Sequence, residues 1–376
     1  MVVHIAFDFF CGGTPSRRAR QDVEALLNAG HRVTVITNSD QGPDLTIKEK
    51  FANQLRVIAV CSIPPLAVTL ELSFAAQCWR ALTNVTRKES VDLLVSHAAT
   101  PCYAAACFAK REKIPSVFVI QALIRDKIGT SANPYSWPTT QMYRHANRFA
   151  ASNMHYSVAI SRYVKQLAIA EGATPENTFV LHNPVDTQTF FPHGDATKDI
   201  DVLFIGRLVS EKGLPVLIEA AHRLSKETRI LIVGDGPLRR HLERRAQHVG
   251  CEIIFQGWIQ NELVPQYIRR ARLQVVPSLS EAQGLVVLEA MACGVPVIGT
   301  ETGGIPDMIK HGKNGWLVPP SDAEALARTI KAVLANDRER DAVARAGYET
   351  AQSFSVNQFN YKALELYEKM TEKFSA

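Results

Sequence analysis

The sequence predicts an α/β protein built from two doubly wound domains. Short β-branched runs alternate with segments of helical periodicity along nearly the whole chain, a pattern typical of parallel sheets covered by helices. The chain has 376 residues, well above the roughly 150 typical of one domain. The alternation pauses once, in the polar stretch 192–198, where we expect a linker between the two domains.

The predicted strands are short and rich in apolar residues. The run 114–120 is largely apolar, which suits a parallel strand covered on both faces. In the first half, strands are predicted at residues 2–7, 31–37, 55–61, 91–97, 114–121, 155–161 and 179–182. In the second half they are predicted at residues 201–206, 228–234, 251–257, 272–277, 295–300 and 315–318.

Helical patterns lie between these strands, among them residues 17–29, 101–111 and a last helix at 355–374. Ser321 and Glu324 have the spacing of a capping box, in which Ser321 accepts a hydrogen bond from the Glu324 amide. Residues 123–140 are polar and are predicted to form a long loop. Long loops in compact domains are often functional.

Composition and charge narrow the class of protein. Hydrophobic residues make up 46% and charged residues 21% of the chain, and no apolar run reaches the roughly 18 residues of a membrane span. The N-terminus lacks the features of a signal peptide, so a cytoplasmic protein is expected. The net charge of +5 is scattered, which argues against nucleic acid as a partner. Weak peripheral contact with the inner face of a membrane remains open.

The cysteines and the one motif typical of metal binding predict neither a disulfide nor a metal site. None of the seven cysteines forms a C-x-x-C, so reduced core thiols are expected. Asp199 and Asp201 match the Asp-x-Asp that holds a divalent ion beside nucleotide sugars. They lie at the entry of a strand, where their side chains diverge across the pleat. We therefore assign both to solvent and expect no metal site.

One candidate site follows the predicted strand 272–277, because ligands of doubly wound sheets bind at the carboxyl ends of strands. A helix begins near Gly284, where the amides of Gly284 and Leu285 lack partners within the helix. This end of a helix favours an anion, most naturally a phosphate. Glu281 and Glu289 suit hydrogen bonds to ligand hydroxyls. Each alone is better explained as an ordinary acid at a helix start or on a helix surface, but together with Gly284 and their spacing they favour ligand contacts.

A second candidate follows the strand that ends at Gly206, and is formed by Arg207 and Lys212. A guanidinium and an ammonium five residues apart across a turn can converge on a diphosphate. Together they can offset the charge of a leaving group. The alternative is that Arg207 pairs with Glu211 and that Lys212 is solvated.

The first strand is followed by Gly12 and Gly13, which permit close approach of the backbone to a ligand. The motif is not G-x-G-x-x-G, which disfavours a nicotinamide dehydrogenase. The sequence also contains no convincing nucleophile–base pair.

These motifs resemble the nucleotide-sugar domain of retaining glycosyltransferases of the GT-B fold, family 4 (glycosyl transferases group 1). The matching stretches are residues 206–213, 233–238, 255–258, 303–307 and the E-x7-E motif from Glu281 to Glu289. The first half is similar more loosely, at residues 12–13, 30–35 and 183–186. The resemblance implies two Rossmann-like domains facing a central cleft. Residues 1–190 would bind the acceptor, residues 191–354 the nucleotide sugar, and a helix in 355–376 would cross back to the N-terminal domain.

The resemblance also implies roles for individual residues. It implies a retaining, metal-independent transfer of a sugar from a nucleoside-diphosphate sugar to an acceptor hydroxyl, with no cofactor. Arg207 and Lys212 would hold the donor diphosphate, Glu281 the sugar hydroxyls and Glu289 the ribose. Donor phosphates would be approached by the backbone of Gly13, Gly206, Gly284 and Leu285.

One position departs from the family. Many members carry a histidine after the strand 114–120, where this chain has Gln121. A glutamine amide can bind a sugar hydroxyl but cannot take a proton. His97, Tyr135 and Trp137 are further candidates for contacts with the sugar or with a small-molecule, lipid or saccharide acceptor. The alternative function is a non-catalytic, sugar-nucleotide-binding partner subunit.

Overall fold

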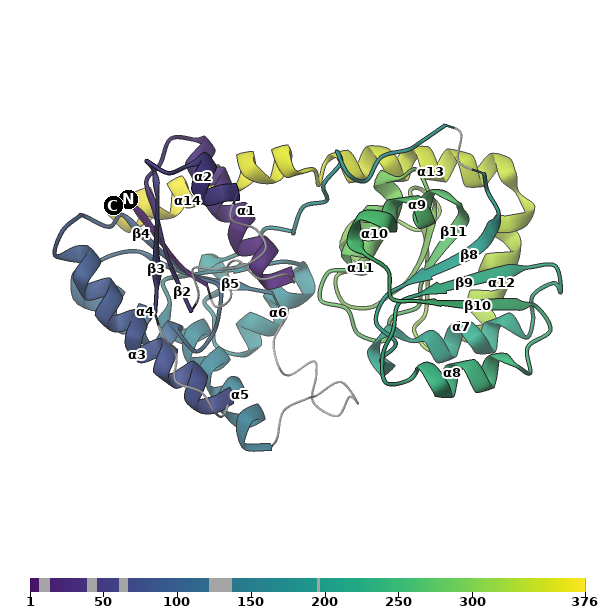
Figure 1. Cartoon of the computed structure of the whole chain (residues 1–376), viewed down its shortest axis with the longest axis horizontal. Coiled ribbons are helices and arrows are strands. Elements are labelled where there is room, and N and C mark those ends of the chain that lie inside the picture. Colours follow the sequence, from purple (N-terminus) through teal and green to yellow (C-terminus); the bar gives the residue numbers. More distant parts are fainter. Residues whose placement is uncertain (7–13, 39–45, 61–66, 122–136, 195–196, 376) are drawn as a thin grey trace. The chain divides into compact units, whose positions relative to one another are not determined.

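The computed structural model describes residues 1–375 except 7–13, 39–45, 61–66, 122–136 and 195–196. The described residues form two compact units (Figure 1). The first unit contains the described residues up to His182 together with Phe359 and the residues after it. The second unit runs from Asn183 to Gln358. Each unit is an α/β layer structure with its own parallel sheet.

The first unit contains a seven-stranded parallel sheet in the order β3-β2-β1-β4-β5-β6-β7. Its central strand β1 pairs with β2 on one side and β4 on the other, so Val3 lies between Thr34 and Leu94. The strands are β1 Val2–Ile5, β2 Val33–Thr37, β3 Leu55–Ala59, β4 Leu93–Ser96, β5 Ser116–Ile120, β6 Tyr156–Ala159 and β7 Thr178–Val180. Every predicted strand is present, each somewhat shorter than predicted.

Helices join these strands. They are α1 Thr14–Asn28, α2 Thr46–Lys50, α3 Ala67–Thr86, α4 Cys102–Glu112, α5 Trp137–Asn153 and α6 Arg162–Ala170. The predicted loop 123–140 is wrong from Trp137 onward, because α5 begins there. Pro138 lies in the first turn of this helix, where the missing amide of proline costs no hydrogen bond. The part of the predicted loop up to residue 136, including Tyr135, lies outside the described residues.

The second unit contains a six-stranded parallel sheet in the order β10-β9-β8-β11-β12-β13. Its strands are β8 Ile200–Ile205, β9 Arg229–Val233, β10 Glu252–Gly257, β11 Ala271–Val276, β12 Val297–Thr300 and β13 Trp316–Val318. Its longer helices are α7 Leu214–Ala221, α8 Arg239–Ala246, α10 Leu285–Ala292, α12 Ala323–Ala335 and α13 Asp337–Gln352. Its shorter helices are η3 Ser210–Lys212, η4 Asn261–Leu263, α9 Val264–Arg269 and α11 Ile305–Met308.

Both faces of this sheet are buried. In β9, Ile230 and Ile232 belong to one apolar cluster and Leu231 and Val233 to another. Alternate side chains therefore enter different cores, which explains why the strands read as continuous apolar runs. The prediction of two doubly wound parallel-sheet domains is confirmed.

The start of α12 differs from the prediction. Asp322, and not Ser321, is the N-cap, and its carboxylate accepts a hydrogen bond from the Ala325 amide at 2.8 Å. Ser321 has a φ of 64°, which is not the extended conformation of an N-cap. Aspartate caps as well as serine does, so the predicted capping box at Ser321 is wrong.

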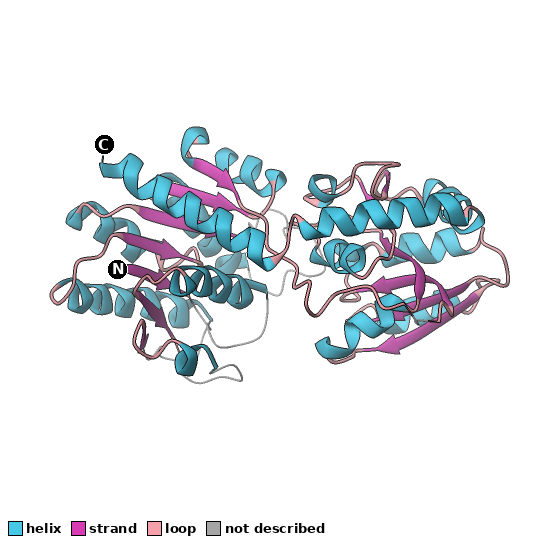
Figure 2. Cartoon of the chain, turned by 90° about the horizontal axis from the view of Figure 1, so that it is seen from above, coloured by secondary structure: helices cyan, strands magenta, loops and turns pink. Residues whose placement is uncertain are grey.

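The last helix, α14 Val356–Ser375, packs on the first unit (Figure 2). Phe359, Ala363, Tyr367 and Met370 lie on one face, at helical spacing. All four are buried in the same apolar cluster as residues of α1, β1 and β2. Burial of a side chain the size of phenylalanine or methionine contributes about 1.5–3 kcal/mol, so α14 is part of this core.

The described cysteines are all free thiols. Cys78, Cys102, Cys251 and Cys293 are buried, whereas Cys107 is exposed, so the expectation of a core thiol is wrong for Cys107. No helix in the described part of the chain combines the length and apolar content needed to cross a bilayer.

Candidate functional site

The first element of the site is the loop that follows β8. The Gly206 amide donates to the Val233 carbonyl at 3.0 Å, and the Leu208 amide donates to the Asp235 carbonyl at 2.9 Å. A Cβ at Gly236 would lie 2.6 Å from the Leu208 carbonyl oxygen. The loop after β9 therefore needs glycine to lie against the loop after β8, and the two support each other.

The next turn carries Lys212 toward the end of β11. Gly213 has a φ of +65°, and a Cβ there would lie 1.8 Å from the Pro277 carbonyl oxygen. The Leu279 amide donates to the Glu211 carbonyl at 2.8 Å. These contacts hold the loop after β8 against the loop after β11, so two of the predicted candidates are adjacent in space.

Lys212 and Glu281 form the central contact of the site. The Lys212 Nζ lies 2.6 Å from Glu281 Oε2, and Ser278 Oγ donates to the same oxygen at 3.3 Å. The two side chains are 23% and 12% exposed. Lys212 is therefore not simply solvated, as the alternative interpretation had it. The sequence predicts that both residues contact a nucleotide sugar, but it carries no signal for their direct pairing.

Arg207 lies at the edge of this group. Its side chain is 69% exposed, and its guanidinium lies 3.9 Å from Glu211 Oε1. The contact with Glu211 agrees with the alternative interpretation for this arginine. At that distance and exposure an ion pair is weak, so the guanidinium can turn toward an anionic ligand at little cost.

The third element is the amino end of α10. Gly284 is its N-cap, with a φ of +95°, and no side chain among the described residues caps the helix. The first turn contains no acidic residue. The positive end of the helix dipole is thus left without a negative partner from its own first turn. This is the arrangement that the predicted phosphate site requires.

The loop after β12 fixes Glu281 from the other side. The Gly304 amide donates to the Glu281 carbonyl at 3.0 Å. A Cβ at Gly303 would lie 1.7 Å from the same oxygen. The strands β8, β11 and β12 are neighbours in the sheet, so the site forms where their carboxyl ends meet. Glu289 lies about one turn into α10 and is half-buried.

The first unit contains five of the predicted site residues: Gly13, His97, Gln121, Tyr135 and Trp137. Gln121 directly follows β5 and is half-buried. Gly13 and Tyr135 lie outside the described residues, and Trp137 begins α5 but its side chain is not described. His97 directly follows β4, and its ring is buried, with Nε2 3.0 Å from Nδ1 of His4.

The two histidines belong to a buried charged network. Asp22 Oδ2 lies 2.8 Å from Arg18 Nε and 3.8 Å from His97 Nε2. The Arg18 guanidinium also donates to the Leu181 carbonyl at 2.8 Å. Burial lowers the pKa of His4 and of His97 to about 3, so both rings are neutral near pH 7. No pattern in the sequence indicates that a buried arginine and aspartate surround this histidine pair.

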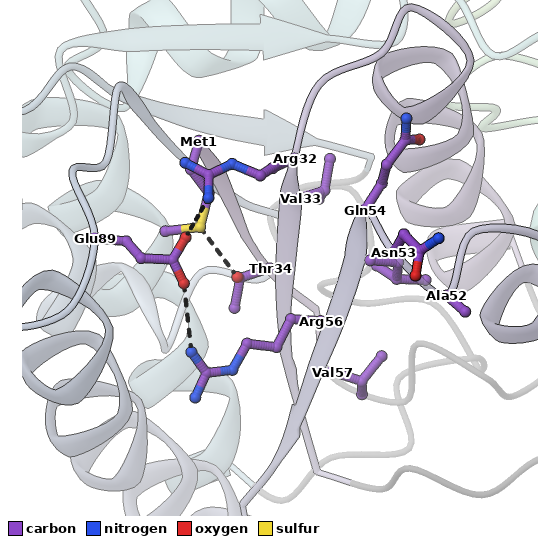
Figure 3. Close-up of a pocket in the computed structure, with 11 residues that line it drawn as sticks. Met1, Arg32, Val33, Thr34, Ala52, Asn53, Gln54, Arg56, Val57 and Glu89 are labelled. Atoms are coloured by element: carbon purple, nitrogen blue, oxygen red, sulfur yellow. Dashed lines mark hydrogen bonds and ion pairs between the residues drawn. The ribbon is translucent and has the colours of Figure 1, made fainter.

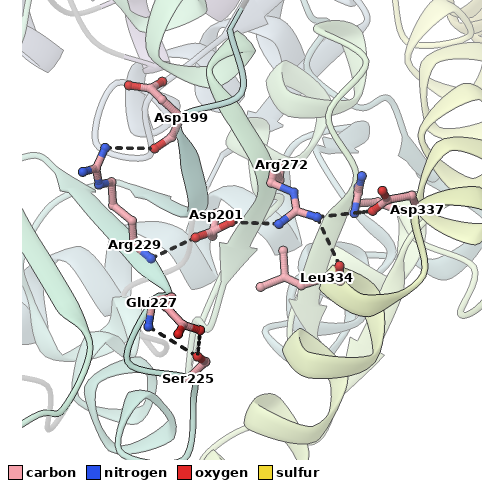
Figure 4. A network of polar contacts seen from close by, with 9 residues as sticks. Asp199, Asp201, Ser225, Glu227, Arg229, Arg272, Leu334 and Asp337 are labelled. Atoms are coloured by element: carbon pink, nitrogen blue, oxygen red, sulfur yellow. Dashed lines mark hydrogen bonds and ion pairs between the residues drawn. The ribbon is translucent and has the colours of Figure 1, made fainter.

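The Asp-x-Asp pair lies at the amino end of β8, as predicted, but its carboxylates are not simply solvated. Figure 4 shows the contacts of the Asp201 carboxylate. Asp199 accepts two hydrogen bonds from Arg270, and this pairing lowers the pKa of Asp199. Asp201 accepts from the Arg272 guanidinium and from the Arg229 amide, each at 3.0 Å. The assignment to solvent is wrong because Arg270, just before β11, and Arg272, within β11, face the two carboxylates. The described residues include no cluster of three or more His, Cys, Asp or Glu that could hold a metal ion.

A cavity of about 460 Å³ opens at the amino ends of the strands β1, β2 and β3 (Figure 3). Within it, Glu89 lies 3.1 Å from Arg32 and 3.7 Å from Arg56. These charges largely satisfy one another. The cavity lies at the edge of the first sheet opposite to the one where ligands of doubly wound sheets bind.

The two parallel-sheet units have the architecture of the GT-B fold. The family described as "Glycosyltransferase Family 4" matches residues 16–189, and the family described as "Glycosyl transferases group 1" matches residues 185–350. The chain belongs to the family-4 glycosyltransferases.

Three known proteins illustrate the similarity. Sulfoquinovosyl transferase SQD2 of Arabidopsis thaliana is 29% identical over 357 residues, covering 90% of this chain and 67% of that protein. The phosphatidylinositol N-acetylglucosaminyltransferase gpi3 subunit of Schizosaccharomyces pombe is 25% identical over 323 residues, covering 83% and 67%. The crystal structure of Anabaena Alr3699/HepE in complex with UDP-glucose has a TM-score of 0.75 at 21% identity, covering 98% of this chain and all of that one.

Proposed function

We propose that this glycosyltransferase transfers a sugar, with retention and without a metal ion, from a nucleoside-diphosphate sugar to an acceptor hydroxyl. The observation that carries the proposal is the Lys212–Glu281 pair beside the uncapped end of α10. A cation and a helix N-terminus bind a diphosphate, and a carboxylate binds sugar hydroxyls. The complex of Alr3699/HepE with UDP-glucose supports this class of donor.

The proposed roles follow from charge and position. On donor binding, Lys212 exchanges part of its contact with Glu281 for a phosphate oxygen, and Arg207 turns onto the diphosphate. The amides of Gly284 and Leu285 bind the distal phosphate, while Gly206 and Gly13 allow the backbone close to it. Glu281 accepts hydrogen bonds from the transferred sugar and Glu289 from the ribose. Two side-chain cations and a helix dipole then offset the leaving-group charge that a metal ion offsets in other enzymes.

The anomeric configuration is retained because the acceptor oxygen attacks the anomeric carbon from the same face of the sugar that the diphosphate leaves. The acceptor oxygen bonds to the anomeric carbon while the bond from that carbon to the phosphate oxygen breaks. The acceptor proton passes to the departing phosphate oxygen, so no protein nucleophile is needed. Gln121 hydrogen bonds to the sugar without taking part in proton transfer. The acceptor, a small molecule, lipid or saccharide, binds to the first unit, where Tyr135 and Trp137 are the residues predicted to contribute. The buried ring of His97 is paired with His4 and is not proposed as an acceptor contact.

The alternative is a non-catalytic subunit that binds a sugar nucleotide. Gln121, at the position where many members carry histidine, favours it, and one relative is named as a subunit of a transferase. The two functions differ in turnover, because a binding subunit releases no nucleoside diphosphate.

The decisive experiment is a screen of UDP-, GDP- and ADP-sugars that detects free nucleoside diphosphate, with and without candidate acceptors. Release that depends on the chain and persists in EDTA is expected. Binding without release would favour the subunit, and loss of binding in EDTA would contradict metal independence. Co-sedimentation with vesicles of anionic lipid tests peripheral contact of a cytoplasmic protein with the inner face of a membrane.

A further inference from the structure

Gln283 makes an unusual pair of contacts within the loop that carries Glu281 and Gly284. Its side chain is buried, and its Oε1 accepts from the Asn183 amide at 2.8 Å. Its Nε2 donates to the Asn183 carbonyl at 2.9 Å. One side-chain amide therefore satisfies both main-chain groups of a residue 100 positions away in the sequence.

Asn183 lies where the chain enters the second unit. Just after it, the Val185 amide donates to the Phe354 carbonyl at 3.0 Å, and Val185 forms a parallel bridge with Ser355. Residues 354–355 lie shortly before the chain leaves this unit after Gln358. The entering and leaving segments are thus joined to each other, and Gln283 fastens the donor loop, residues 278–284, to the entering one.

We propose that Gln283 is a positioning residue of the donor site, which sets the place of Glu281 and Gly284 by holding the donor loop to Asn183. The inference rests on the proposed function. It does not follow from packing alone, because an apolar side chain of similar size would fill the space equally well. What only an amide supplies here is a donor and an acceptor at once.

Neither leucine nor ionised glutamate at position 283 can make both contacts of Gln283. Leucine would remove the hydrogen bonds that Gln283 makes to the amide and the carbonyl of Asn183, and losing such bonds to buried groups is costly. Ionised glutamate would still accept from the Asn183 amide but would face the Asn183 carbonyl with a second acceptor. Protonated glutamate carries both a donor and an acceptor, so it can reproduce both contacts.

This difference provides the test. We would measure UDP, GDP and ADP binding by titration calorimetry for the wild type, Gln283→Glu and Gln283→Leu between pH 5 and pH 8. The control is Gln247→Glu, the same change at an exposed position at the carboxyl end of α8. Thermal melting would confirm that each variant is folded at the pH used.

We expect Gln283→Glu to bind the nucleotide about tenfold or more weakly at pH 8, as expected when a buried contact is lost. Its affinity should approach that of the wild type toward pH 5, because burial favours the protonated carboxyl. Gln283→Leu should stay weak at every pH, and Gln247→Glu should follow the wild type. The pH-dependent rescue is a readout that a general loss of stability would not produce.

Two results would overturn the inference. Wild-type affinity in folded Gln283→Glu and Gln283→Leu at pH 8 would refute the positioning role alone. Absence of nucleoside-diphosphate binding by the wild type would refute the proposed function and the inference with it.

Discussion

Lys212 Nζ and Glu281 Oε2 lie 2.6 Å apart, although the two residues are 69 positions apart in the sequence. In the structure, the ammonium proposed for the diphosphate is therefore engaged by the carboxylate proposed for the sugar. A diphosphate that binds as proposed would compete with Glu281 for part of this cation. The proposed roles of the two residues would then be coupled through their contact.

Glu281→Gln is the most direct test of this pair. Turnover should fall severely, because the carboxylate that binds the sugar hydroxyls is lost, while the fold is retained. Affinity for the free nucleoside diphosphate should hold or rise, since Lys212 no longer has a competing partner. Product-release kinetics and calorimetry measure the two effects. Glu349→Gln, at an exposed position of α13, is the control, and unchanged turnover in Glu281→Gln would disprove its role.

Arg207→Ala and Lys212→Ala should each weaken nucleoside-diphosphate binding by about 1.5–3 kcal/mol, the range for a lost hydrogen bond to a charged group. Calorimetry with the nucleotide identified in the donor screen measures this. Arg328→Ala removes an exposed arginine on α12 that pairs with Glu324, and it should bind like the wild type. Affinities within twofold of the wild type in both site variants would argue against the assigned diphosphate contacts.

A pair of glycine variants tests how the loop after β8 is held. Gly213 and Gly312 have φ values of +65° and +71°, so alanine costs about 1–2 kcal/mol of backbone strain at either position. A Cβ at Gly312 meets nothing within 4 Å, whereas at Gly213 it would overlap the Pro277 carbonyl. Urea unfolding should therefore show a clearly larger loss for Gly213→Ala, together with weakened nucleotide binding. Equal losses would mean that the contact with Pro277 is easily relieved.

The buried histidines predict an acid-sensitive fold. Burial, the neighbouring ring and Arg18 hold the pKa of His4 near 3, and burial and Arg18 do the same for His97, whereas Asp22 opposes the shift of His4. The unfolded chain binds protons at both rings near pH 6.5, so it binds more protons than the folded chain between about pH 6.5 and 3. The free energy of unfolding should fall as the pH decreases through this range, by up to about 1.4 kcal/mol per pH unit and histidine.

Urea unfolding of His4→Gln combined with His97→Asn, measured from pH 7 to pH 4, checks this. The variant should lose most of the extra pH dependence, because neither replacement titrates. His248→Asn, at an exposed position, should retain the slope of the wild type. The interpretation fails if the double variant and the wild type show the same slope.

The strands could be predicted because nearly every one is a short apolar run bounded by polar residues, and the burial on both faces of β9 shows why. The positions of Arg207, Lys212, Glu281 and Gly284 could be predicted as well, since each follows a strand. Their pairing could not, because it depends on contacts between loops, such as the close approach of Gly213 to Pro277. The contact of Gln283 could not be predicted for a similar reason, because its partner, Asn183, is distant in the sequence.

The buried surroundings of His97 could not be predicted from the sequence either. A histidine after a strand resembles a ligand contact, and only the packing of α1 and β1 shows that this ring lies inside the domain. The end of the polar segment before α5 was misjudged because Trp137 and Pro138 continue a loop-like composition into the first turn of the helix. Local sequence describes the strands well, but not every helix start, and not which buried groups face one another.

The packing of α14 on the first unit has a consequence for the order of events during translation. Phe359, Tyr367 and Met370 fill a core whose other members begin at Val2. A nascent chain that has emerged only through residue 182 lacks these side chains and exposes the apolar groove they occupy. The core of the amino-terminal half therefore cannot be completed until the second half has been synthesised. Until then its apolar side chains are exposed to aggregation or to chaperones.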